Sequence, residues 1–111
     1  MAYNEQLADR VREALEDVPN VEEKKMFRGV TFMVNDKMCV SVSNDELMCR
    51  IDPALTDEVV EMNGVRPMLM RGKTLKGYVY VAEEAIRTKK DFYYWINLCL
   101  AYNPKANKSK K

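Results

Sequence analysis

Short segments of alternating apolar residues, grouped on both sides of a helix signal, constrain the fold of this chain most strongly. Asp52 can cap a helix that has Pro53 at its first position, and Asn63-Gly64 can end that helix. Three strands are predicted before this helix and two after it, at residues 25–34, 38–43, 46–51, 66–70 and 76–82. Because strand hairpins on both sides of a helix favour an antiparallel sheet, the predicted class is α+β.

Two further helices complete the predicted domain. An apolar stripe through Leu7, Val11 and Leu15 predicts a helix over residues 4–17, and a second stripe predicts one from Thr88 or Asp91 to about Tyr102. The predicted order is therefore α-β3-α-β2-α, a two-layer fold with helices on one face of the sheet. We expect one domain over residues 1–103 and a basic, disordered tail over 104–111.

The alternation also predicts how the middle strands pair. A loop at Asn44-Asp45 sets Val42 opposite Leu47, Val40 opposite Cys49 and Met38 opposite Ile51 on one apolar face. The other face then carries Cys39, Ser41, Met48 and Arg50. In the preceding hairpin, a two-residue loop sets Phe32 opposite Cys39, whereas a three-residue loop sets it opposite Val40. The longer loop matches the apolar faces better.

The charges are divided unevenly along a nearly neutral chain. Residues 1–65 hold 7 Lys and Arg against 14 Asp and Glu, and residues 66–111 hold 11 against 3. Pairing of the acidic first helix with later basic segments is one interpretation, and a dipolar surface is the other. Residues 1–20 carry charges throughout and lack the apolar run of a secretion signal, and no apolar run in the sequence reaches the ~20 residues of a membrane span. We therefore expect a cytoplasmic protein.

Groups typical of catalytic and metal sites are scarce. The chain has no histidine, no phosphate-binding glycine motif and only three cysteines, at positions 39, 49 and 99. Their spacing predicts buried, free thiols, and a reactive Cys39 near Arg50 is the alternative. We expect no enzymatic activity, no cofactor and no metal.

Two surfaces are candidates for binding. Methionines on the strands predict either a soft core or an adaptable protein-binding face that includes Met48 and Tyr80. A predicted loop over residues 71–77 is basic, and it predicts either a solvated loop or a nucleic-acid contact. The contact would use the cations Arg66, Arg71, Lys73 and Lys76 with the aromatic Tyr78 and Tyr80. A homodimer is compatible with either surface.

Several stretches resemble the N-terminal domain family of TfoX, a bacterial competence regulator also called Sxy. They follow the family's order over nearly the whole chain and read MAYNEQLADRVREAL, KKMFRGVTFMVNDKMCVSV, LMCRID, MRGKTLKGYVYV and DFYYWINLCLAYNP. The resemblance implies a fold similar to that of secretion chaperones, and it carries over no catalytic residues. The resemblance implies that family regulators carry a second, helical domain and act as transcriptional co-activators beside the cyclic-AMP receptor protein; we expect the present chain to hold the first domain alone.

The family pattern Met-Phe-Gly-Gly is altered here to Met26-Phe27-Arg28-Gly29. Glycine within a strand indicates a bulge or the close approach of another backbone, and Gly29 keeps that capacity. We expect the Arg28 side chain to face solvent or a partner and to be able to pair with Glu46. The predicted function is a non-catalytic protein-binding module related to transcription or competence, with nucleic-acid binding through residues 66–77 and the tail as the alternative.

Overall fold

The computed structural model describes residues 3–26 and 29–106 of the chain. Within these ranges the fold is α+β, with three α-helices and a six-stranded antiparallel sheet of order β1-β2-β3-β4-β6-β5. The helices are α1 (Glu5–Ala14), α2 (Thr56–Val59) and α3 (Lys89–Tyr102). The strands are β1 (Val21–Met26), β2 (Gly29–Val34), β3 (Lys37–Ser43), β4 (Glu46–Arg50), β5 (Val65–Met70) and β6 (Lys73–Val81).

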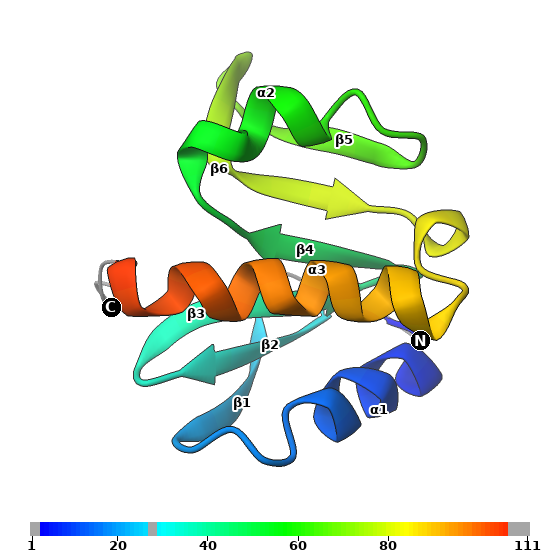
Figure 1. Cartoon of the computed structure of the whole chain (residues 1–111), viewed down its shortest axis with the longest axis vertical. Coiled ribbons are helices and arrows are strands. Elements are labelled where there is room, and N and C mark those ends of the chain that lie inside the picture. The colour runs from blue at the N-terminus through cyan, green and yellow to red at the C-terminus, as the bar shows by residue number, and fades with distance from the viewer. Residues whose placement is uncertain (1–2, 27–28, 107–111) are drawn as a thin grey trace.

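The helices cover one face of the sheet (Figure 1). Asn4 caps α1 by accepting a hydrogen bond from the Leu7 amide, and Thr88 caps α3 by accepting one from the Asp91 amide. The buried residues of these helices and of α2 pack with alternate strand residues in one core; among them are Leu7, Val11, Val59, Phe92, Trp95, Ile96, Phe32, Val40 and Val79. The predicted helix stripes are therefore confirmed. The sheet face without helices carries a separate, smaller apolar cluster.

The predicted strand over residues 25–34 is wrong, because the chain reverses within it. β1 pairs with β2 in an antiparallel register that runs from Val21 opposite Val34 to Met26 opposite Gly29. The charged residues of β1 show no apolar alternation, so a pattern based on alternation gives no strand before residue 25. The sheet consequently has one strand more than the predicted order.

A bulge in β3 changes the predicted faces of two residues. Phe32 lies opposite Val40, as predicted, but Met33 lies opposite Met38, so Cys39 is the extra residue. The loop before it is therefore the shorter one, Asn35-Asp36. Past the bulge, Cys39 joins the helix-side core and Met38 lies on the helix-free face, the reverse of the prediction. The predicted pairs of Val42 with Leu47 and of Val40 with Cys49 are confirmed.

The predicted loop over residues 71–77 is also wrong. The turn contains only Arg71 and Gly72, both at positive φ (55° and 81°), and β6 begins at Lys73. Such backbone angles suit a two-residue hairpin turn. Met68 pairs with Leu75 and Pro67 with Val79, so three residues of β6 between them have no partner on β5. The outer part of the hairpin, residues 68–75, extends past the β4 pairing, which covers residues 78–81 of β6.

Candidate functional site

The helix-free face of the sheet holds a cluster of methionine and tyrosine side chains, here called the methionine–tyrosine cluster. Three buried methionines form its centre, and three partly buried side chains surround them: Met33, Met38 and Met48, with Met68, Tyr78 and Tyr80. They come from every strand between β2 and β5, because alternate residues of a strand share a face. Flexible methionine side chains can adapt their packing to different neighbours.

One row of residues crosses all six strands on this face. The register sets Lys24, Thr31, Ser41, Met48, Tyr80 and Arg66 side by side, in that order. Thr31 and Ser41 are buried, and their hydroxyl oxygens lie 2.7 Å apart, so each hydroxyl satisfies the other. At its centre the row therefore has apolar side chains and two hydroxyls that hydrogen-bond each other. Each end of the row carries a cation, Lys24 or Arg66.

Burial corrects the expectation that Met48 is exposed. The residue is only 3% exposed, so it offers almost no surface to a partner. Met68, Tyr78 and Tyr80 are half-buried and form the accessible part of the cluster. The soft-core interpretation therefore holds for Met33, Met38 and Met48, and the tyrosines remain candidates for contact.

Arg66 is ordered by two contacts on this face. Its Nη2 lies 2.7 Å from Glu46 Oε1, and its guanidinium carbon lies 4.5 Å from the centre of the Tyr80 ring. The side chain thus crosses Tyr80 to reach β4, and the ring face stabilises the cation. Glu46 is the carboxylate that was expected to pair with Arg28, which lies outside the described residues. Arg50 repeats the arrangement more loosely, 5.6 Å from the Tyr78 ring.

The outer end of the β5–β6 hairpin is the most exposed apolar and basic region of the described chain. Leu69 is 62% and Met70 56% exposed, and Arg71 and Lys73 are exposed beside them. Met70 lies two residues after Met68, so it extends the methionine–tyrosine cluster outward on the same face. We call Met68, Met70, Arg71, Lys73, Tyr78 and Tyr80 the hairpin surface.

The predicted cationic residues do not form one group. Lys76 Nζ lies 3.0 Å from Asp57 Oδ2 at the end of the sheet that α2 covers, and Arg66 is held by Glu46. Within the described ranges, only Arg71 and Lys73 of the four are exposed and form no hydrogen bond or ion pair. The tail residues 107–111 lie outside those ranges.

Sequence reasoning missed the exposure of Leu69. The signal was its place in Met-Leu-Met, where apolar residues occupy both faces of a strand.

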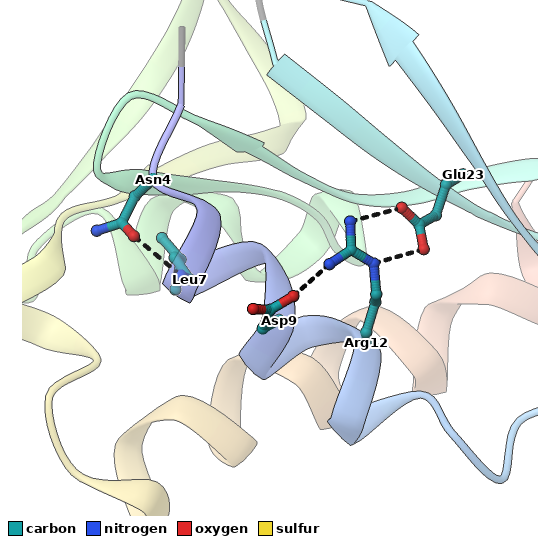
Figure 2. A network of polar contacts seen from close by, with 5 residues as sticks. All are labelled: Asn4, Leu7, Asp9, Arg12 and Glu23. Carbon is teal, nitrogen blue, oxygen red and sulfur yellow. Dashed lines mark hydrogen bonds and ion pairs between the residues drawn. The ribbon is translucent and has the colours of Figure 1, made fainter. Parts of the chain in front are cut away.

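The ion pairs of α1 differ from the interpretation in which the acidic first helix pairs with later basic segments. α1 pairs with β1, not with later basic segments: Arg12 binds Glu23 with two hydrogen bonds, of 2.7 and 2.9 Å, and also binds Asp9 (Figure 2). The basic hairpin lies at the opposite edge of the sheet, beside α2 (Figure 1). Opposite edges of the molecule therefore differ in charge.

The three cysteines lie together in the helix-side core as free, buried thiols, as predicted. The inference that Cys39 and Cys49 face opposite sides is wrong, because the bulge turns Cys39 inward. A hydrogen bond with Cys99 and burial raise the pKa of Cys39, and Arg50 only partly offsets them. For Cys99, the hydrogen bond with Cys39 lowers the pKa. The hydrogen bond with Cys49 and burial outweigh this effect, so the pKa of Cys99 is also raised. Burial and a raised pKa both disfavour the thiolate that a reactive cysteine needs, so they support the buried-thiol interpretation.

The described residues hold neither a candidate metal cluster nor a membrane-spanning helix. No cluster of three or more acidic or cysteine side chains there has a geometry that can hold a metal ion. No helix in the same ranges is long and apolar enough to cross a bilayer.

Comparison with known protein families places most of the chain in one family model. Residues 13–102 match the TfoX N-terminal domain family, a range that contains every strand of the sheet and both helices after β4. No curated protein and no solved structure matches the chain significantly.

Proposed function

The chain belongs to the TfoX N-terminal domain family, and from this premise we propose that it is a non-catalytic protein-binding module of a transcription or competence regulator. The proposal places the contact on the hairpin surface. The observation that carries it is the exposure of Met70, at 56%, beside the exposed Arg71 and Lys73 on a strand pair that extends beyond the sheet. Exposed large apolar side chains that continue a partly buried cluster are typical of interaction sites.

The chemistry of this surface limits the partner. Met70 and the half-buried tyrosines offer apolar contact, and Arg71 and Lys73 place positive charge beside them. A protein segment with an apolar side chain flanked by Asp or Glu is complementary to this arrangement. Aromatic side chains and methionine are also the types enriched in the centres of protein interfaces.

A variant series tests the proposal. The variant Met70→Ser is compared with Met62→Ser, whose methionine is also exposed but lies outside the hairpin. A partner captured by the parent chain is identified, and its affinity for all three proteins is measured by calorimetry. We expect a loss of at least tenfold in the hairpin variant, on the order of 1.4 kcal/mol, and no change in Met62→Ser. Equal affinities for all three proteins would overturn the proposal.

Nucleic-acid binding is the second candidate, supported by the exposed Arg71 and Lys73 at the end of the hairpin. Two phosphate contacts give a slope of log affinity against log salt of roughly −1.8 for duplex DNA. A salt dependence this shallow means a small electrostatic contribution to DNA affinity. Together with the near-neutral net charge of +1, it makes protein binding the better supported function. Fluorescence anisotropy with labelled duplex DNA tests the alternative. A slope that falls to near zero in Arg71→Ala/Lys73→Ala would support it, and no binding at low salt would exclude it.

A further inference from the structure

The edge strand β1 has a pattern of charges that fits a second copy of itself. β1 pairs with β2 on one side, and on its other side the described structure places no strand. Four consecutive residues of the strand are exposed and charged, two acidic and then two basic: Glu22, Glu23, Lys24 and Lys25. Charges on an edge strand usually discourage pairing, so the question is whether this order favours one particular partner.

The backbone fixes which residues are able to bond outward. The Asn35 amide donates to the Asn20 carbonyl oxygen over 3.1 Å, and the β1–β2 register continues from this pair without a shift. Because bonded and non-bonded pairs alternate in an antiparallel ladder, residues 22 and 24 turn their backbone groups toward β2. Val21, Glu23 and Lys25 therefore direct their amides and carbonyls away from the sheet.

Symmetry then limits the register of a pair of β1 strands. Two identical antiparallel strands are related by a two-fold axis normal to the sheet, so residues that face each other must lie on the same face in both copies. An axis at Glu23 sets Glu22 opposite Lys24 of the partner copy, and Lys24 opposite Glu22 of the partner copy. The outward-bonding residues 21, 23 and 25 face one another in the same register, which supplies the backbone hydrogen bonds.

The axis itself sets Glu23 against Glu23 of the partner copy. This like-charge contact is moderated within each copy, because Arg12 binds both carboxylate oxygens of Glu23 (Figure 2). An axis one residue later sets Lys24 against Lys24 of the partner copy, and no carboxylate among the described residues is bonded to that side chain. The register centred on Glu23 is therefore the better matched of the two.

We propose that β1 is a self-association edge, through which two copies of this chain form one continuous antiparallel sheet centred on Glu23. The dimer leaves the hairpin surface free, because β5 and β6 lie at the opposite edge of each sheet. The inference therefore goes beyond the proposed function and does not depend on it. A dimer would present two hairpin surfaces, one at each end of the joined sheet.

Charge reversal tests the register. Glu22→Lys sets Lys against Lys twice across the axis, and Lys24→Glu sets Glu against Glu twice, so each single variant should raise the dimer dissociation constant roughly tenfold. The double variant Glu22→Lys/Lys24→Glu restores two opposite-charge pairs and should dimerise like the parent chain. Mixing the two single variants should likewise restore a dimer that contains one copy of each. Sedimentation velocity over a concentration series at low salt measures all of these species.

Lys25 provides matched controls. Lys25→Glu makes the same charge change as Lys24→Glu but faces Val21 of the partner copy, so its dissociation constant should change much less. Lys25→Pro removes an amide that points outward, which an edge strand tolerates, so the variant should keep its unfolding midpoint and lose the dimer. A parent chain that stays monomeric at all concentrations would overturn the proposal. A double variant whose dimer dissociation constant is as high as those of the single variants would overturn it as well.

Discussion

Gly29 lies against the backbone of Val42 on the neighbouring strand. A Cβ atom built on residue 29 would lie 1.9 Å from the Val42 carbonyl oxygen, well inside any allowed contact. This close approach explains why a glycine follows Arg28 in a segment of otherwise large residues. It also lets β2 begin directly after the reversal and pair at once with both of its neighbours.

The change Gly29→Ala should therefore destabilise the domain severely. The β2 and β3 backbones must separate to accept the methyl group, and overpacking of this kind costs about 1–3 kcal/mol or more. Gly72→Ala is the matched control, since nothing lies within 4 Å of its added Cβ and only the positive φ opposes it. We expect that control to lose about 1 kcal/mol. Urea unfolding measures both, and equal losses would contradict the backbone explanation.

The Thr31–Ser41 pair should show strong coupling. Thr31→Val or Ser41→Ala alone leaves a buried hydroxyl without its partner, at a cost of about 1–3 kcal/mol each. Removing both hydroxyls should cost less than the sum of the single changes, because no unsatisfied group remains. A double-mutant cycle of unfolding free energies gives the coupling directly. Additive losses would show that the 2.7 Å contact contributes little.

Asn103 should be one of the most sensitive polar positions. Its buried side-chain amide donates to the Val34 carbonyl oxygen over 3.1 Å. The backbone carbonyl oxygen of Asn103 in turn accepts a hydrogen bond from Lys37 Nζ, also over 3.1 Å. These bonds fix the end of α3 to the β2–β3 hairpin. Asn103→Ala should lower the free energy of unfolding by about 1–3 kcal/mol, whereas Asn97→Ala, on the exposed side of α3, should be neutral or slightly stabilising. Thermal and urea unfolding compare the two variants.

The buried thiols predict how stability depends on pH. The fold raises the pKa of Cys39 and of Cys99 above that of an unfolded thiol, about 8.5. The folded state therefore keeps protons that the unfolded state releases above that pH. Their contribution to stability is fully present below the unfolded pKa and is lost progressively as the pH rises beyond it.

Unfolding free energies measured between pH 7 and 10 should consequently fall more steeply for the parent chain than for Cys39→Ala. The comparison uses the slope against pH, because the truncation also lowers stability by a constant amount through the lost packing. Identical slopes would contradict the predicted protonation of the Cys39 thiol in the folded state.

Much of the fold was predictable wherever the side chains alternate clearly. The β3–β4 register followed from Asn44-Asp45 and from Val40, Val42 and Leu47, whose pattern permits one set of faces. β1 was missed because Glu22 through Lys25 carry no apolar alternation. The Cys39 bulge was missed because Met38 and Cys39 are both apolar, so either of them fits the core.

The candidate site was less predictable, since it depends on which strands become neighbours. Tyr78 and Tyr80 share the helix-free face, as their alternation predicts. The contact of Arg66 with Tyr80 and Glu46 requires β6 to lie between β4 and β5, and no local pattern gives that order. The two-residue turn was hidden because Arg71 adopts a positive φ of 55°, which arginine rarely takes.

The strand order at the β5 edge has a consequence for assembly of the domain. β5 precedes β6 in the chain but contacts the rest of the sheet only through β6. β5 therefore has no partner in the sheet until β6, which follows it in the chain, has been synthesised. Because the Arg71-Gly72 turn joins the two strands through only two residues, we expect them to close locally as a hairpin and then to dock on β4 together.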